Sequence, residues 1–190
     1  MSTKLKIRTP EGVREVGLSD VRPYTLYDTV TYAAATAKSE DYFFRTPEGK
    51  TLVDTNLKQF STIQVGWTFE VSSIRIIPRC NISVADMETL FTGSVLTFLR
   101  EGDIEIFTMP SIMLNAGCGL AGATTNTAED LVSLGLPSAG AVHRMPIRFL
   151  LYGGETFNFR IQHIPSVTLA AERKIYLVLD GILKRGVRGA

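Results

Sequence analysis

The chain has 190 residues, a formal net charge of +1 and a hydrophobic content of 45%. This size allows one large domain, or one domain with arms, to bury a full core without disulfide bonds or metal ions. The near-neutral charge argues against a protein that holds nucleic acid mainly through a basic surface. The two cysteines, Cys80 and Cys118, are too few for a disulfide framework and are expected to be buried thiols in a reducing compartment.

The first residues contain no apolar stretch typical of an export signal. The longest uncharged stretch, residues 111–128, is rich in Gly, Asn and Thr and is unsuited to a lipid bilayer. We therefore expect synthesis in a cytoplasm without a recognisable export signal.

The pentapeptide Arg-Thr-Pro-Glu-Gly occurs twice, at residues 8–12 and 45–49, and its Pro and Gly positions favour a type I turn. Short strand-like runs flank both copies, so two small hairpins are predicted. The paired runs are residues 5–7 with 13–16 and residues 42–44 with 51–53. One turn used twice is favoured over an internal duplication, because nothing else repeats at this offset.

Residues 33–37, which lie between these hairpins, favour a short helix. Residues 63–77 form the clearest long strand, with apolar residues first at odd and then at even positions. The change of phase at Ser72-Ser73 predicts a β-bulge. Trp67 is in phase with the apolar positions and is expected in the core.

Ser83 precedes an apolar helical pattern, with Asp86 at the third helical position and Gly93 as the stop signal, which predicts a short helix. A hairpin follows, with strands at residues 95–100 and 104–109.

Residues 111–143 contain only two charges and five glycines, and are predicted to form a long crossing loop. Thr127–Asp130 resembles a second capping box, with Leu131 and Leu134 as the apolar positions of an embedded helical turn. Because small residues permit close backbone approach, we expect this loop to contact neighbouring subunits. The expected contact residues are Gly117, Gly119, Ala123 and Thr124.

Three consecutive strands are predicted between residues 142 and 184, of which the first two alternate between apolar and polar residues. If these two form a hairpin around Gly153–Glu155, the apolar positions fix its register. The predicted opposite pairs are Phe149 with Phe159, Leu151 with Phe157, and Met145 with His163.

This register places Arg148 opposite Arg160, with Arg144 one diagonal further along. Like charges in this position require a carboxylate partner. The partner is either an intrachain residue such as Glu70 or Asp180, or an acidic residue of a neighbouring subunit.

The C-terminus adds a basic tail with Lys184, Arg185 and Arg188. Such a tail can contact nucleic acid, an inner membrane or an adjacent protomer. For a chain with a net charge of +1, the protomer contact is favoured, and any contact with a genome or an inner membrane is expected to be weak.

His143 and His163 are the only histidines, and the hairpin register would bring them to one face of the sheet. A metal pair or a pH switch would need further ligands that the sequence does not offer, so structural hydrogen bonds are favoured. Cys118 has no obvious base nearby, and the glycines from Gly117 to Gly122 do not follow a strand as a dinucleotide motif requires. We expect no enzyme activity, cofactor, metal or small-molecule substrate.

About eight strands, two short helical insertions and an N-terminal extension predict an all-β, jelly-roll β-sandwich. Residues 1–60 are predicted to form an arm or a small hairpin subdomain, and residues 61–190 the jelly-roll domain.

The final third contains the sequences Gly-Glu-Thr-Phe-Asn-Phe at residues 154–159 and Leu-Asp-Gly-Ile-Leu-Lys-Arg at residues 179–185. With Gly-Leu-Pro at residues 135–137 and Arg-Met-Pro-Ile at residues 144–147, this region resembles the closing strands of jelly-roll coat proteins of tailless icosahedral bacterial viruses. The resemblance implies a self-assembling capsid subunit in the virion, made in the host cytoplasm. It implies copies of the chain and other capsid proteins as partners, and it carries over no active-site residues.

Two alternatives remain open. A carbohydrate-binding, receptor-attachment sandwich of a virion spike would need exposed aromatic residues over a groove, for which Tyr24, Tyr27, Tyr32 and Tyr42 are the candidates. A cupin-like enzyme is disfavoured by the presence of only two histidines.

Overall fold

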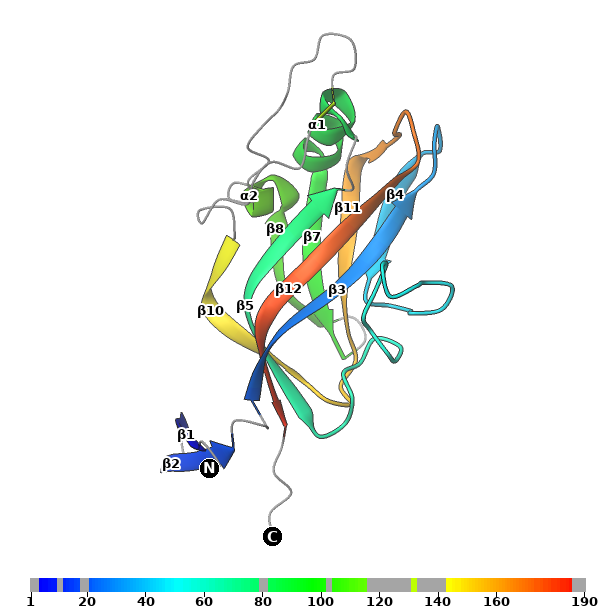
Figure 1. The fold of residues 1–190 in the computed structure, drawn as a ribbon. Helices are drawn as coiled ribbons and strands as arrows, with labels where there is room; N and C mark the ends of the chain where they lie inside the picture. Colours follow the sequence, from blue (N-terminus) through cyan, green and yellow to red (C-terminus); the bar gives the residue numbers. More distant parts are fainter. Residues whose placement is uncertain are drawn as a thin grey trace.

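The protein is described by a computed structural model that covers residues 4–9, 12–17, 21–78, 82–101, 104–115, 131–132 and 143–185. Its principal feature is a sandwich of two four-stranded antiparallel sheets (Figure 1). The elements are β1 (Lys4–Thr9), β2 (Gly12–Gly17), β3 (Val21–Tyr32), β4 (Lys38–Phe43), β5 (Trp67–Pro78), β6 (Ile82–Ser83), α1 (Val84–Thr92), β7 (Ser94–Arg100), β8 (Ile104–Pro110), α2 (Ser111–Asn115), β9 (Leu131–Val132), β10 (His143–Tyr152), β11 (Phe157–Val167) and β12 (Arg173–Arg185).

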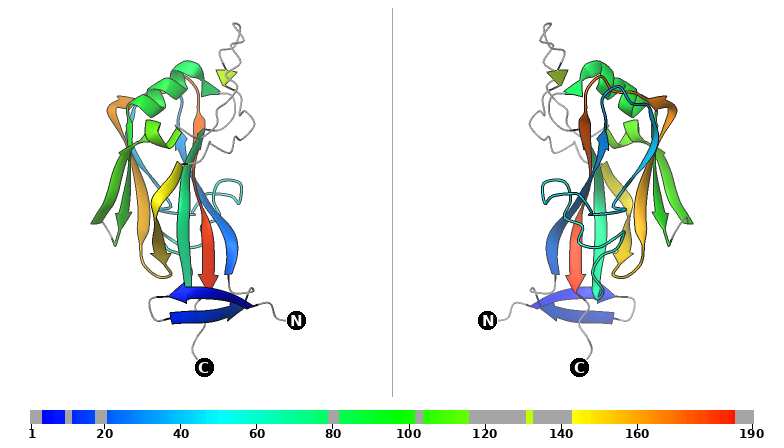
Figure 2. Two further views of the ribbon diagram at one scale, coloured as in Figure 1. Left: turned by 90° about the vertical axis from the view of Figure 1, so that its left-hand side faces the viewer. Right: turned by 90° about the vertical axis from the view of Figure 1, so that its right-hand side faces the viewer.

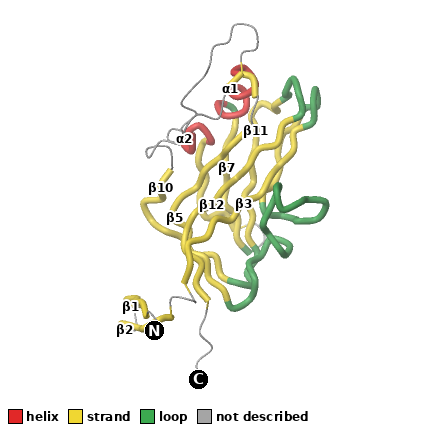
Figure 3. Tube along the Cα trace, in the orientation of Figure 1, coloured by secondary structure: helices red, strands yellow, loops and turns green. Residues whose placement is uncertain are grey.

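The strand order identifies the sandwich as a jelly roll. One sheet has the order β10-β5-β12-β3 and the other has the order β4-β11-β7-β8. Successive sandwich strands mostly alternate between the sheets, and the last strand, β12, lies beside the first, β3. Figure 2 shows the sheets side-on as two layers, and Figure 3 shows both helices near one end. The predicted fold class is therefore confirmed.

The sandwich begins earlier in the chain than residue 61. Strands β3 and β4 are edge strands of the two sheets, so residues from Val21 onward belong to the sandwich rather than to an arm. The strands β1 and β2 form an antiparallel hairpin of their own, in which Leu5 pairs with Val16, and this predicted hairpin is confirmed.

The predicted hairpin between β10 and β11 is wrong, because the two strands belong to different sheets. Gly153 N–H donates to Trp67 O at 2.7 Å and Gly154 N–H donates to Ile63 O at 3.0 Å. A Cβ at Gly153 would lie 2.3 Å from Gln64 O, so this close backbone approach requires glycine. The Gly-Gly segment is thus held against the loop before β5 and carries the chain from one sheet to the other.

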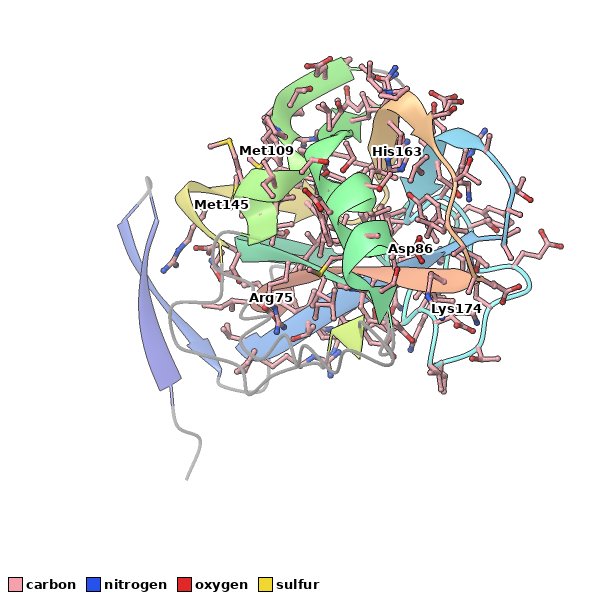
Figure 4. The ribbon with its side chains drawn as sticks, turned by 90° about the horizontal axis from the view of Figure 1, so that it is seen from above. Arg75, Asp86, Met109, Met145, His163 and Lys174 are labelled. Atoms are coloured by element: carbon pink, nitrogen blue, oxygen red, sulfur yellow. The ribbon has the colours of Figure 1, made fainter. Side chains whose placement is uncertain are left out.

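Strand β10 instead pairs with β5, and β11 pairs with β4 and β7. Met145 and His163 are therefore not opposite each other, and Figure 4 shows them well apart on separate strands. The core still contains or contacts the predicted apolar residues Met145, Phe149 and Leu151 of β10 and Phe157, Phe159 and Ile161 of β11.

Several local predictions are confirmed. Ser83 caps α1 by accepting from the Asp86 N–H at 3.1 Å, and Gly93 ends the helix. Strands β7 and β8 pair as the predicted hairpin. In β5, Ser72 is the extra residue of a bulge, because Asp180 pairs with Ser73 and Gly181 pairs with Val71.

Other local predictions are wrong. Residues 51–53 do not pair with β4, which pairs with β11 instead, and Lys50 N–H closes a turn on Pro47 O. Residues 33–37 form a turn with Ala35 at φ 54° rather than a helix. Leu131–Val132 form a strand with β6 where a helical turn was expected, and the second short helix is α2. In each case, pairing with a distant segment overrides the local preference.

A row of phenylalanines fills the centre of the core. Phe43, Phe159, Phe98 and Phe107 are register neighbours across the four strands of one sheet. The Phe98 and Phe159 rings stack with centroids 4.7 Å apart. Phe149 of the other sheet lies 4.9 Å from Phe98, so aromatic packing joins the two layers.

Candidate functional site

The predicted arginine pair is separated by the sandwich. Phe149 faces the core from β10 and Phe159 faces it from β11, so the neighbouring Arg148 and Arg160 lie on opposite outer faces. Arg144 pairs through its backbone with Ser73 of β5. The expectation that Arg148 faces Arg160 is therefore wrong.

On one outer face, Glu70 holds two of the predicted residues. Its carboxylate accepts from Arg148 Nη1 at 2.8 Å and also forms an ion pair with Lys184. The hydrogen bond from Arg148, followed by that from Lys184, lowers the pKa of Glu70. The intrachain partner named for Arg148, Glu70, is confirmed, while Asp180 pairs with Arg75 at 2.8 Å.

On the other outer face, Arg160 occupies a polar row. The register neighbours of Arg160 are Tyr42 on β4 and Thr97 on β7, and Thr97 in turn pairs with Thr108 on β8. The two threonine hydroxyls are 2.9 Å apart. Among the described residues, the Arg160 Nε–H is buried and has no hydrogen-bond acceptor.

The edge of this second sheet is apolar and exposed. Strand β8 pairs only with β7 among the described strands, and its one charged residue is Glu105. Ile104 is 56% exposed and Ile106 is 47% exposed. The adjoining α2 adds exposed Ile112 and Met113. We call Ile104 and Ile106 the β8 edge patch. A strand edge that is unpaired among the described strands and carries apolar side chains is suited to binding another chain.

At the end of the sandwich where β3 begins and β12 ends, a pocket of about 80 Å³ includes Arg22, Tyr24 and Trp67 in its wall. Trp67 was expected in the core, but it is only partly buried, although it packs against core residues. Arg185, a predicted contact residue, lies with its guanidinium 5.9 Å from the Trp67 ring. Sequence reasoning missed this pocket, because its residues come from three distant segments.

Of the tyrosines named for a carbohydrate groove, only Tyr24 lines this pocket. Tyr32 is buried, and its hydroxyl lies 2.8 Å from His163 Nε2. The Tyr27 hydroxyl donates to the Leu52 carbonyl. The Tyr42 ring lies under the Arg45 guanidinium on the other sheet.

The two histidines belong to different sheets, since His143 pairs with Ile74 and His163 pairs with Ser94. The expectation that they share a face is wrong. Burial, aided by the positive charge of Lys38, lowers the pKa of His163 to about 4, while Asp41 acts in the opposite direction. No group of three His, Cys, Asp or Glu side chains suited to a metal ion occurs among the described residues.

Five predicted contact residues lie outside the described residues: Gly117, Gly119, Ala123, Thr124 and Arg188. Cys80, Cys118 and Gly122 also lie outside them. None of the helices in the described ranges is long and apolar enough to span a membrane.

No family model matches the chain, and no curated protein matches it. Among solved structures, the chain is similar to one described as "nora virus structure", with 10% sequence identity and a TM-score of 0.28. The match covers 87% of this chain and 59% of that chain.

Proposed function

We propose that this protein is a capsid subunit of a tailless icosahedral bacterial virus, and that it acts by self-assembly rather than by catalysis. The observation that carries the proposal is the β8 edge patch on a complete jelly roll. The resemblance of the closing strands to jelly-roll coat proteins supports the same function.

The physical basis is that an assembling subunit needs exposed surfaces that another copy can cover. Ile104 and Ile106 lose contact with water when a neighbour packs against them, which favours association. The edge of β8, which no described strand pairs with, also offers backbone groups for pairing with a strand of another copy. Many such contacts, each weak, sum over the copies of a closed shell.

The remaining proposed partners are other capsid proteins, and the proposed location is the virion after synthesis in the host cytoplasm. The loop with Gly117, Gly119, Ala123 and Thr124 is proposed as a further subunit contact, because it is nearly uncharged and rich in small residues. Arg185 and Arg188 are proposed to contact an adjacent protomer. Lys184 and Arg148 are already engaged by Glu70.

Electron microscopy and mass photometry of the purified protein test this function. We expect shells, rings or other closed oligomers that grow with protein concentration. The double variant Ile104→Lys/Ile106→Lys should remain a folded monomer, because two charges at the β8 edge patch oppose contact with a second copy.

The matched control is Leu52→Lys/Val53→Lys, which places the same charges at exposed apolar positions of the loop between β4 and β5. We expect the control to assemble. A wild-type protein that stays monomeric at high concentration would contradict the proposed function, and loss of assembly in both variants would contradict the role of the β8 edge patch.

A further inference from the structure

The pocket at the end of the sandwich has a cationic and aromatic lining without an acidic residue. Its wall includes Arg22, Tyr24, Lys58, Gln64, Trp67 and Leu183. The volume, about 80 Å³, is sufficient for a small polyatomic group. We call it the Trp67 pocket, and its chemistry is independent of the β8 edge patch.

The cations at the Trp67 pocket differ from most others on the protein in lacking a carboxylate. Seven described lysines and arginines form ion pairs, among them Arg75 with Asp180 and Lys174 with Asp54. Within the described residues, no carboxylate lies at ion-pair distance from Arg22, Lys58 or Arg185. Three positive charges therefore lie at one end of the sandwich without a counter-charge among the residues that the structure describes.

Aromatic rings orient the Arg22 guanidinium. Its Cζ atom lies 5.4 Å from the Tyr24 ring centroid and 5.3 Å from the Trp67 ring centroid. Contact with ring faces stabilises the charge but satisfies none of the N–H donors. The Arg22 guanidinium makes no hydrogen bond to a described residue. Its N–H groups therefore remain available to oxygen acceptors, and its planar fork of donors matches a carboxylate or a phosphate.

The wall of the pocket is held in place before any ligand binds. Asn56, which also lines the pocket, accepts from the Tyr27 N–H at 2.9 Å and donates to Thr25 O at 2.7 Å, so it anchors the loop to β3. The lining residues Leu26 and Leu183 are buried. Arg22 and Lys58 are themselves exposed, so a dissolved anion can reach both cations.

We propose that the Trp67 pocket binds one oxyanion, a carboxylate or a phosphate, with Arg22 as the main binding residue and Lys58 as a second cation. The oxyanion comes either from a free small molecule or from an acidic side chain of a second copy of the chain. The shared chemistry is a small, planar or tetrahedral oxygen anion that accepts from the N–H donors of the Arg22 guanidinium.

Trp67 is the single tryptophan of the chain, so its fluorescence reports directly on this pocket. We expect a saturable change when acetate or inorganic phosphate is titrated into the monomeric Ile104→Lys/Ile106→Lys variant at constant ionic strength. Glucose, a neutral ligand, should produce no change. Arg22→Gln should weaken anion binding by about tenfold or more, and Lys58→Gln should weaken it less.

Arg45→Gln is the matched control, because it removes a guanidinium that lies over Tyr42, outside the pocket. It should leave the titration unchanged. Arg22→Lys keeps the charge without the planar fork and should bind with intermediate affinity, and thermal unfolding checks that each variant is folded.

Two outcomes of the fluorescence experiment distinguish the source of the oxyanion. Saturation by acetate or phosphate in the monomer supports a free ligand. Fluorescence that instead changes with protein concentration in the wild type, but not in Arg22→Gln, supports a carboxylate of a second copy. An equal response to glucose, or unchanged anion affinity in Arg22→Gln, would overturn the proposal.

Discussion

Phe149 of β10 and Phe159 of β11 face each other across the sandwich, with ring centroids 6.4 Å apart. Phe98 packs against both rings, at 4.9 Å from Phe149 and 4.7 Å from Phe159. The two sheets are therefore joined at their centre by three aromatic rings, and the stability of the jelly roll depends on this contact.

Phe159→Ala should lower the free energy of unfolding by about 3–5 kcal/mol, because it removes a fully buried ring and leaves a cavity. Urea unfolding followed by circular dichroism measures the loss. Val53→Ala, at an exposed position, should change stability by no more than about 0.5 kcal/mol. Equal effects of the two substitutions would contradict the aromatic core described here.

Gly181→Ala should be strongly destabilising, by more than about 2 kcal/mol. A Cβ at this position would lie 2.0 Å from Glu70 O and 2.9 Å from Glu70 C, so the backbone of β5 would have to shift. Gly93→Ala is the control, since its Cβ would meet only ordinary contacts at 3.5 Å. Thermal unfolding of both variants tests the close approach, and a stable Gly181→Ala protein would show that the bulge can open.

The stability should fall as the pH is lowered from about 6.5 to 4, partly because of His163. Its pKa is about 4 in the folded protein and is expected to be near 6.5 in the unfolded chain. The unfolded chain therefore binds more protons in this window, so acidification favours unfolding, by about 3 kcal/mol in total. The stability that depends on neutral His163 is fully present above pH 6.5 and is lost as the pH falls toward 4.

His163→Gln removes this titration while it retains a group that can hydrogen-bond to the Tyr32 hydroxyl. Urea unfolding at pH 7 and pH 4.5 should show a larger loss of stability for the wild type than for the variant. Carboxylates such as Glu70 titrate in both proteins, so their effect cancels in the difference. Identical pH dependence would show that His163 is not held neutral by burial.

Lys50→Met should destabilise the protein by about 3–5 kcal/mol, because it leaves the buried Asp28 carboxylate without a counter-charge. Asp28 has no exposed surface, and it accepts from Lys50 Nζ at 2.7 Å and from the Phe44 N–H at 2.5 Å. Adding Asp28→Asn to Lys50→Met should recover part of the loss, because no buried charge then remains. A double-mutant cycle from urea unfolding gives the coupling, and additive effects would contradict it.

Elements that depend on neighbours in the sequence were predictable. Ser83 caps the start of α1 and Gly93 ends it, and each acts on backbone groups within one or two turns of the helix. The change of apolar phase at Ser72 revealed the bulge in β5, because alternation reports directly which face of a strand is buried. The hairpin of β7 and β8 followed from two short runs with a turn between them.

The partners of β10 and β11 were decided by the tertiary structure. Alternation shows that Phe149 and Phe159 both face the core. A hairpin within one sheet and two strands in facing sheets would both bury these residues, so alternation does not distinguish the two arrangements. The close approach of Gly153 to Gln64 O decides between the two arrangements. This contact joins segments about ninety residues apart in the chain.

The Trp67 pocket was also decided by the tertiary structure. Nothing in the local sequence connects Arg22, Trp67 and Arg185, and each alone is an ordinary strand residue. The sequence by itself determined α1, the β7–β8 hairpin and the core-facing positions of Phe149 and Phe159, because these follow from capping residues and short-range periodicity. Only the pairing of β12 with both β3 and β5 brings these three side chains to one end of the sandwich, because sheet order depends on contacts between segments far apart in the chain.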